Sequence, residues 1–155
     1  MRFWIVLISI VLTSTFAHAE IKFPKEKIKL GGKTITVEVA RSNEQLAHGL
    51  MYRTQMGEND GMIFVFPDVD TRSFWMKNTF IPLSIGFFDE DKILVDIQDM
   101  EAVKSEMVTT PPSYVSAKPA KYALEMNRGW FLKNSVKVGA KFEGLSDTKT
   151  PRKRP

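Results

Sequence analysis

The sequence predicts a single, mainly β (α+β) domain, a small β-barrel or sandwich-like fold with one short α-helix near its N-terminal third. Two observations predict this class. Short alternating or fully apolar runs are separated by turn residues about every ten residues, a spacing typical of small sandwiches and barrels. The chain has 155 residues, of which 43% are hydrophobic and 26% charged, and this composition suits one globular domain. We place the domain at residues 20–145.

Residues 1–19 have the pattern of a secretory signal peptide. Arg2 precedes an apolar run over residues 3–12, and a small-residue cleavage site ends at Ala19. A retained membrane anchor is the alternative, but the apolar stretch is shorter than the roughly 20 residues that a membrane-spanning helix needs. We therefore expect a cleaved signal peptide, export to the periplasm or the extracellular space, and no transmembrane segment in the mature chain.

The basic charge of the chain is concentrated in its tail, residues 146–155. This tail contains two prolines and four Lys or Arg against one Asp, whereas residues 20–145 carry 17 basic and 17 acidic residues. A short charged segment of this composition is expected to be disordered. The sequence pI of about 9.3 therefore mainly reflects the tail and not a basic folded face, and we expect no nucleic-acid partner.

The first predicted elements are two strands and a helix. Residues 21–30 and 33–40 form apolar or alternating runs joined by two glycines, which predicts a β-hairpin. Ser42 is followed three residues later by Gln45, the spacing of a capping box at a helix start. Gly49 is placed to end this short helix.

The later elements follow from apolar runs and turn residues. Residues 62–66 are apolar on both faces, which predicts a strand in the centre of the sheet. Three prolines between residues 109 and 119 predict a loop. The remaining patterns predict a hairpin of residues 83–88 and 93–97, a strand over residues 122–126, a helical turn over residues 130–134 and a last short strand over residues 141–145.

Few residues of the mature chain suit catalysis. It has no cysteine and a single histidine, His48. The absence of Cys excludes a disulfide scaffold, a thiolate metal site, a catalytic cysteine and a lipoprotein anchor. No serine has the flanking glycines of a nucleophile elbow, and the acidic pairs near Asp68 and Asp89 suit turns and do not continue into a calcium loop. We expect a protein with no cofactor that is not an enzyme.

Methionine supplies one metal-binding alternative. Thioether sulfur is a soft ligand suited to Cu(I), and His48, Met51, Met62 and Met76 form a conceivable soft-metal site. Methionine also fills irregular gaps in cores, and the closely spaced methionines typical of copper-binding segments are absent. Core packing is therefore the favoured interpretation.

Four motifs resemble one known family. The chain is similar to the family called domain of unknown function 192 over nearly all of residues 20–145. The motifs are Gly49-Leu50-Met51-x-Arg53, Gly61-Met62-x-Phe64-x-Phe66, Phe74-Trp75-Met76-Lys77-Asn78-Thr79-x-x-Pro82-Leu83 and Ala123-Leu124-Glu125-x-Asn127-x-Gly129. The resemblance implies a compact, mainly β domain with a short helix, often exported, and no established reaction or ligand.

The chain departs from the family pattern at one position. Many members carry an acidic residue directly after the Pro-Leu step, where this sequence has Ser84. A metal or acid-base role that depends on a carboxylate at that position is therefore not expected in this chain.

The polar residues of the motifs predict a candidate ligand-binding site. Its members are Arg53, Trp75, Met76, Lys77, Asn78, Thr79 and Glu125. In this interpretation, Trp75 and Met76 form the floor of a shallow site, and the basic and polar side chains around it hold a small ligand. The alternative is structural: Arg53 pairs with Glu125 or with nearby carbonyls, and Asn78 and Thr79 satisfy a tight turn.

We therefore expect an exported, non-enzymatic binding domain that uses the surface of residues 74–79. Its partner would be a small polar or anionic ligand or an envelope protein, because an apolar patch rimmed by polar groups suits either one. Soft-metal binding is the first alternative. The second is a carboxylate-based hydrolase in which Glu125 works with an Asp, a chemistry that requires two carboxylates at a defined separation.

Overall fold

The structure is a computed structural model that describes residues 21–146. The expected signal peptide and all of the expected basic tail except Ser146 lie outside these residues. No helix in residues 21–146 is both long and apolar enough to cross a membrane. In chain order the elements are β1 (Lys25–Leu30), β2 (Lys33–Ala40), α1 (Asn43–His48), β3 (Asp60–Asp70), β4 (Ser73–Trp75), β5 (Leu83–Phe88), β6 (Leu94–Met100), β7 (Ser113–Val115), β8 (Ala120–Asn127) and α2 (Trp130–Lys133).

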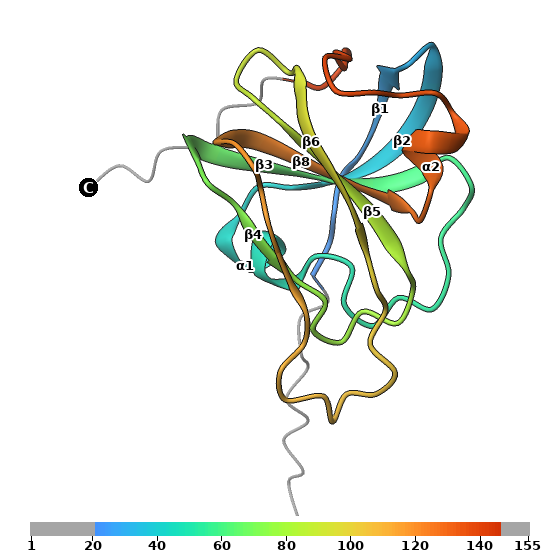
Figure 1. The fold of residues 1–155 in the computed structure, drawn as a ribbon, viewed down its shortest axis with the longest axis vertical. Coiled ribbons are helices and arrows are strands. Elements are labelled where there is room, and N and C mark those ends of the chain that lie inside the picture. Colours follow the sequence, from blue (N-terminus) through green and yellow to red (C-terminus); the bar gives the residue numbers. More distant parts are fainter. Residues whose placement is uncertain (1–20, 147–155) are drawn as a thin grey trace, which may run out of the picture.

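A six-stranded mixed sheet forms the centre of the domain (Figure 1). Its strand order is β1-β2-β3-β8-β5-β6, and β4 and β7 form a separate two-stranded sheet. The neighbours β2 and β3 run parallel, whereas the other neighbouring pairs are antiparallel. The mainly β class is thus confirmed. The large sheet is open, with β1 and β6 at its edges, and no closed barrel is found among the described strands.

The predicted N-terminal hairpin and helix are confirmed. Strands β1 and β2 pair antiparallel across the two glycines. At the start of α1, the Ser42 hydroxyl accepts from the Gln45 amide (3.2 Å), and the Gln45 side-chain oxygen accepts from the Ser42 amide (3.1 Å). Both halves of the capping box are therefore formed, which satisfies amides that the first helical turn leaves without intrahelical acceptors.

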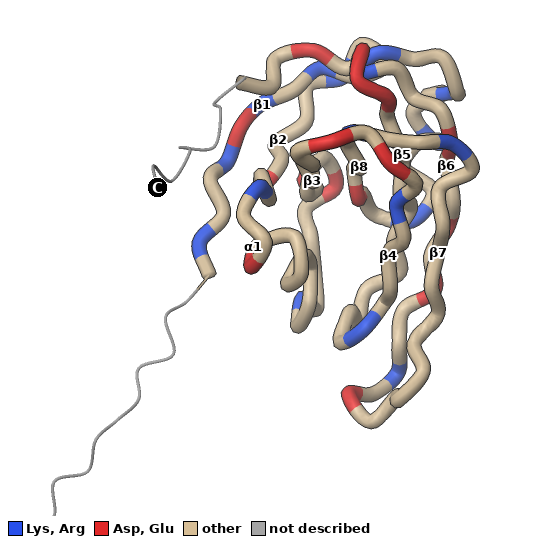
Figure 2. Tube along the Cα trace, turned by 90° about the vertical axis from the view of Figure 1, so that its left-hand side faces the viewer, with Lys and Arg blue, Asp and Glu red and all other residues tan. Residues whose placement is uncertain are grey.

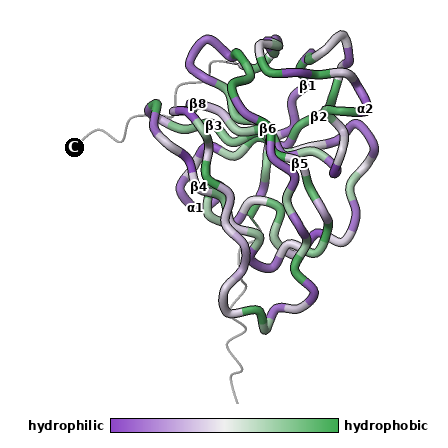
Figure 3. The backbone as a smooth tube through the Cα atoms, viewed as in Figure 1, coloured by the Kyte–Doolittle hydropathy of each residue, from purple (hydrophilic) through white to green (hydrophobic). Residues whose placement is uncertain are grey.

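Strand β3 is central, as its apolar run predicts. It lies between β2 and β8, and Met62, Ile63 and Phe64 are all buried. Because successive side chains of a strand point to opposite faces, β3 contributes to two hydrophobic clusters, with Ile63 on one face and Met62 and Phe64 on the other. Figure 3 shows hydrophobic stretches along the strands and hydrophilic stretches in several connecting loops.

One face of the sheet is covered by the C-terminal part of the chain. Trp130 and Phe131 of α2 belong to its cluster, together with Phe142 further on. Residues 141–145 do not form the expected strand but make isolated bridges from Lys29 to Glu143 and from Ile93 to Lys141. The segment lies between the two edges of the sheet, so it pairs briefly with each and cannot extend a ladder along either.

The opposite face is covered by α1 and by the small β4–β7 sheet, which lie together on the other side of the sheet from α2 (Figure 1). Strand β7 lies within the segment that the sequence predicts to be a loop. The prolines 111, 112 and 119 flank this strand and leave the amides of residues 113–115 free to pair. The inward residues Phe74 and Tyr114 pair across the two strands and pack on the cluster of this face.

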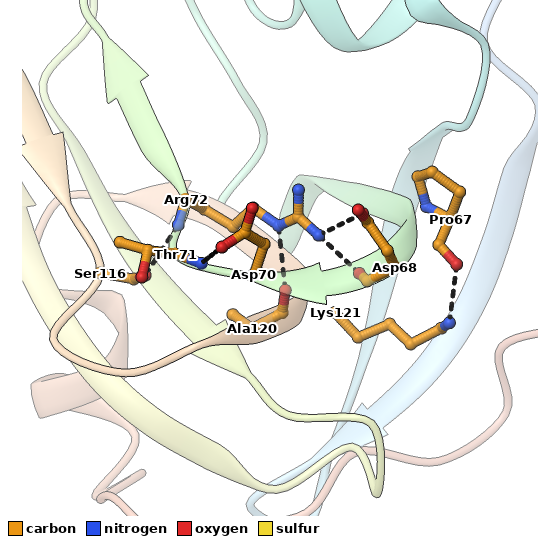
Figure 4. A network of polar contacts seen from close by, with 8 residues as sticks. All are labelled: Pro67, Asp68, Asp70, Thr71, Arg72, Ser116, Ala120 and Lys121. Atoms are coloured by element: carbon orange, nitrogen blue, oxygen red, sulfur yellow. Dashed lines mark hydrogen bonds and ion pairs between the residues drawn. The ribbon is translucent and has the colours of Figure 1, made fainter.

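Arg72 ties the small sheet to the large one (Figure 4). Its backbone amide donates to the Ser116 hydroxyl (2.9 Å), and its guanidinium donates to the Ala120 carbonyl (3.0 Å) and to the Asp68 carboxylate (2.7 Å). The guanidinium also lies 4.1 Å from the ring centre of Phe66. The Arg72 side chain thus joins the end of β3 to the start of β8, and its backbone amide holds the segment after β7, so that this one residue fixes where β4 begins.

We predict that Arg72→Ala destabilises the domain by about 2–3 kcal/mol, because the side chain is only 13% exposed and makes charge-assisted hydrogen bonds. The matched control is Lys121→Ala, which removes a single bond to the Pro67 carbonyl and should cost no more than about 0.5 kcal/mol. Urea unfolding monitored by circular dichroism measures both values. Equal small losses would show that the guanidinium does not hold the layers together.

Candidate functional site

A small cavity of about 30 Å³ lies between α1, the small sheet and the face of the large sheet. From α1 and the turn after it come Leu46, His48 and Met51, and Phe64 of β3 forms part of the wall. The rest of the lining includes Phe74 and Trp75 of β4, Thr79 of the turn after β4, and Glu125 of β8. The cavity therefore brings together three of the seven residues that the sequence predicts for a site, Trp75, Thr79 and Glu125.

Glu125 occupies the middle of the sheet. It lies opposite Met62 of β3 and Ile85 of β5, and directly opposite residues point to the same face. Only 5% of the residue is exposed. Among residues 21–146, no hydrogen bond or ion pair to its carboxyl group is found, so the cavity is where a partner for this group can be placed.

Burial raises the pKa of the Glu125 carboxyl to about 8, because the low-polarity surroundings disfavour the charged form. Glu38, which lies two strands away at the same level of the same face, shows the opposite arrangement. Its carboxylate is paired with Arg53 at 2.5 Å and with Lys25 at 3.9 Å. Of two carboxyl groups in one row across the sheet, the outer one has cations beside it and the central one has none.

Strand β4 places one aromatic ring inward and one outward. The Phe74 ring packs edge-on against Phe64, with ring centres 4.8 Å apart, and against Phe87 at 5.8 Å. The next residue, Trp75, alternates outward and is 51% exposed. The Lys77 ammonium group lies 5.1 Å from the centre of the Trp75 ring, a cation–π distance.

The turn that follows β4 is fixed by reciprocal hydrogen bonds to the turn after α1. The Tyr52 amide donates to the Asn78 carbonyl (2.7 Å), and the Asn78 side-chain amide donates to the Tyr52 hydroxyl (2.7 Å). Both residues have a positive φ, 64° for Tyr52 and 51° for Asn78. Thr79 is buried, and its hydroxyl donates to the Lys77 carbonyl (3.1 Å). The tight turn expected for Asn78 and Thr79 is thus present.

Arg53 pairs with Glu38 and not with Glu125, contrary to the structural alternative in the sequence interpretation. Glu38 lies on β2 and Glu125 on β8, with β3 between them, so a side chain that pairs with Glu38 lies two strands away from Glu125. Arg53 and Glu38 line a separate and larger cleft of about 400 Å³, together with Lys25, Gln55 and Asp60. The structure therefore does not bring Arg53 to the cavity at Glu125.

The four residues of the soft-metal alternative are divided between the cavity and the core. His48 and Met51 line the cavity, whereas Met62 and Met76 are buried in the cluster beneath it. The His48 ring lies between the rings of Phe23 and Tyr52, at 6.1 and 6.2 Å. No group of three or more His, Cys, Asp or Glu suited to a metal ion occurs within residues 21–146.

Ser84, the position at which the family resemblance leads us to expect an acidic residue, takes part in a local hydrogen-bond network. Its hydroxyl donates to Asp99 on the neighbouring strand (2.5 Å) and accepts from the Gly129 amide (2.8 Å). The network anchors the turn that leads into α2, and it lies apart from the residues that line the cavity. Ser84 is therefore accounted for by the fold.

Sequence reasoning missed Tyr52, Phe64 and Phe74 as parts of the site. Alternation in β8 does carry a signal, because a strand with Leu124 and Met126 on one face must place Glu125 on the other. In a sheet buried on both faces, that position is inside the protein. The positions of Phe74 and Tyr52 depend on the pairing of β4 with β7 and on the Tyr52–Asn78 hydrogen bonds, which no local pattern shows.

The fold and the site define the class of protein: a single mainly β domain with an open mixed sheet, covered on both faces, and a small cavity at a buried carboxyl group. The chain belongs to the DUF192 family, described as Uncharacterized ACR, whose model matches residues 26–144. This confirms the resemblance seen in the motifs. Among curated proteins, none matches the chain.

Two solved structures are similar to most of the chain. A protein of Sinorhizobium meliloti 1021, called a "putative transcription regulator", is 36% identical, with a TM-score of 0.71, over 81% of this chain and 98% of that chain. A protein of unknown function from Novosphingobium aromaticivorans DSM 12444 is 30% identical, with a TM-score of 0.66, over 84% of this chain and 91% of that chain.

We predict that Asn78→Ala destabilises the domain more than Tyr52→Phe does. The Tyr52 variant loses one hydrogen bond, worth about 1 kcal/mol. The Asn78 variant loses the same bond and also places alanine at a φ of 51°, which adds about 1 kcal/mol of strain. Asn78→Gly, which relieves the strain, should return to the Tyr52→Phe value. Urea unfolding tests this order, and equal losses for Asn78→Ala and Asn78→Gly would contradict it.

We predict that the stability of the wild type falls as pH rises from about 4.5 to about 8. In this window the unfolded chain releases the Glu125 proton, because its pKa there is 4.5, whereas the folded chain retains it up to about 8. The contribution is fully present below pH 4.5 and is lost at about 1.4 kcal/mol per pH unit until the folded pKa is passed.

Glu125→Gln removes this contribution, so its stability relative to the wild type should rise between pH 5 and pH 8. Urea unfolding of both proteins at several pH values measures the difference. Glu106→Gln, at an exposed loop position, serves as the control, and its free energy of unfolding should change with pH as that of the wild type does. If the free energy of Glu125→Gln also changed with pH in the same way as the wild type, Glu125 would have the same pKa in the folded and unfolded chains.

Proposed function

We propose that this chain is an exported binding domain, without catalytic activity, that holds a small polar ligand or a segment of an envelope protein at the surface of residues 74–79 and the adjoining cavity. The observation that carries the proposal is a buried carboxyl group, Glu125, at a cavity bordered by the half-exposed Trp75. A buried ionisable group without a partner is costly, and such groups concentrate at functional sites. Exposed tryptophan is typical of contact surfaces.

The charges at this surface favour a polar ligand over a purely anionic one. Lys77 supplies a positive charge beside Trp75, but Arg53, the second cation expected there, is paired with Glu38 in the other cleft. Glu125 is the one carboxyl group among the described residues that line the cavity. A ligand that fills the cavity therefore meets Glu125, whereas one that lies across Trp75 meets Lys77.

A role in nucleic-acid binding, which the name of the Sinorhizobium relative suggests for that protein, is less well supported here. Residues 20–145 carry equal numbers of basic and acidic residues. Figure 2 shows Lys and Arg interspersed with Asp and Glu along the chain, with no basic face in that view. Binding to the phosphate backbone depends on clustered positive charge.

Both alternative functions, soft-metal binding and two-carboxylate hydrolysis, would use residues of the same cavity. His48 and Met51 both line it and could take part in soft-metal binding, but Met62 and Met76 lie in the core. A hydrolase of the two-carboxylate type needs a second carboxylate near Glu125, and no other Asp or Glu is found in the described lining. Neither alternative accounts for the exposed Trp75.

Native mass spectrometry of the chain recovered from the periplasm of an expressing bacterium tests the proposal. We expect an intact mass that begins at Glu20 and a stoichiometric extra mass from a bound molecule or partner. Trp75→Ala and Thr79→Val should lose the extra mass. Arg53→Ala is the matched control and should retain it, because Arg53 lies in the separate cleft.

The outcomes separate the candidates. An extra mass that Arg53→Ala removes, and Trp75→Ala does not, would place binding in the larger cleft and overturn the proposed site. Stoichiometric uptake of added Cu(I) that depends on His48 and Met51 would favour the metal alternative. An apo mass under all conditions, with no partner retained, would contradict a binding function at this surface.

A further inference from the structure

This inference rests on the proposed function and specifies the chemistry of its ligand. We propose that the cavity at Glu125 receives one primary ammonium group at the end of an alkyl chain. The group would come either from a small free amine or from a lysine side chain of a partner protein. The argument rests on the size of the cavity, the hydrogen-bonding groups that line it and the aromatic rings around it.

The cavity suits a compact group. Its volume of about 30 Å³ is no more than about three times the roughly 10–15 Å³ that one water molecule needs. An ammonium group is close to water in size, whereas a planar guanidinium or a quaternary ammonium is larger. Leu46, Leu50 and Phe64 form an apolar part of the lining, which suits the methylene chain that carries the charge.

The polar side chains of the lining are arranged to accept hydrogen bonds. Glu125 makes no hydrogen bond or ion pair within residues 21–146, so both of its oxygens are available as acceptors once its proton is released. Thr79 donates its hydroxyl proton to the Lys77 carbonyl, which leaves the lone pairs of the oxygen to accept. An ammonium group has three donors and no acceptor, and therefore complements a carboxylate beside a hydroxyl oxygen.

Three aromatic residues belong to the lining of the same cavity. Phe64, Phe74 and Trp75 all line it, and the negative face of an aromatic ring attracts a cation within about 6 Å. The chain already shows this contact on Trp75, because the ammonium group of Lys77 lies 5.1 Å from the ring centre. A carboxylate together with aromatic rings is a combination that favours a cation over an anion or a neutral polar group.

Binding of a cation should be coupled to proton release. With a pKa of about 8, Glu125 of the free protein is mostly protonated at neutral pH, whereas the bound ammonium requires the carboxylate. Affinity should therefore rise with pH up to about 8. Two other titratable groups face this region, His48 in the lining and Lys77 at Trp75. A positive charge on His48 would also weaken the binding of a cation at lower pH. The His48 ring must therefore be followed separately from Glu125.

Titration of the full chain with butylammonium chloride, monitored by two-dimensional NMR, tests the proposal. We expect shifts of the Glu125 and Thr79 amides and of the Trp75 indole signal, and binding at least about tenfold weaker at pH 6.5 than at pH 8. Butanol, which lacks the charge, and tetramethylammonium, which has no N–H donor for Glu125 or Thr79, should cause no such shifts. The His48 ring signals in the same samples report its own titration.

Variants locate the site and separate the two sources of the amine. Glu125→Gln should abolish binding, and Thr79→Val provides a second variant in case the first does not fold. Glu106→Gln and Arg53→Ala, which lie outside the cavity, should bind as the wild type does. Tighter binding of butylammonium than of Nα-acetyl-lysine methylamide indicates a small free amine, and the reverse order indicates a lysine of a protein.

Failure of this inference can be distinguished from failure of the proposed function. The ammonium chemistry is overturned if amines cause no shifts, if Glu125→Gln binds them as the wild type does, or if tetramethylammonium binds equally well. If one of these results is found while an extra mass still depends on Trp75, the binding function stands with another ligand. If no extra mass is found either, both proposals are rejected.

Discussion

The hydrogen bonds of the Arg72 guanidinium hold the small β4–β7 sheet in place over one face of the large sheet, and the arrangement of that face depends on them. A six-stranded sheet with apolar residues on both faces must be covered on both, and here one cover is a pair of three-residue strands that cannot be stable alone. Arg72 joins this small sheet to the large one through Ala120, Asp68 and the Phe66 ring. Phe74 can then pack on the sheet and Trp75 can face outward.

Burial of Glu125 follows from the same arrangement. On an uncovered sheet face its carboxyl group would be hydrated and ionised. Once α1 and β4 cover that face, the charged form loses water, and the fold supplies no partner to replace it among the described residues. Glu38, which lies at the same level near the edge, has two cations beside it, so position in the sheet decides which of the two carboxyl groups has a charged partner.

Local patterns predicted most of the large sheet. Two hairpins, the central strand β3 and the capping box at Ser42 depend on residues close together in sequence, and each was found where its pattern placed it. The small sheet was not predicted, because β4 and β7 lie about 40 residues apart and each is too short to show an alternation. The pattern of residues 141–145 predicts a strand, but the segment makes only isolated bridges to the two edges of the sheet. Its residue types do not show that it crosses from one edge to the other.

The sequence by itself determined the mainly β class, the family and the polar residues that are unusual within apolar motifs, because each depends on residue type and short-range spacing. Only the tertiary structure decided which of these residues meet. It placed Arg53 with Glu38 in one cleft, Trp75 and Thr79 with Glu125 at another, and Met76 in the core. The physical reason is that strand order and layer packing bring distant segments together, and neither is encoded in the spacing of neighbouring residues.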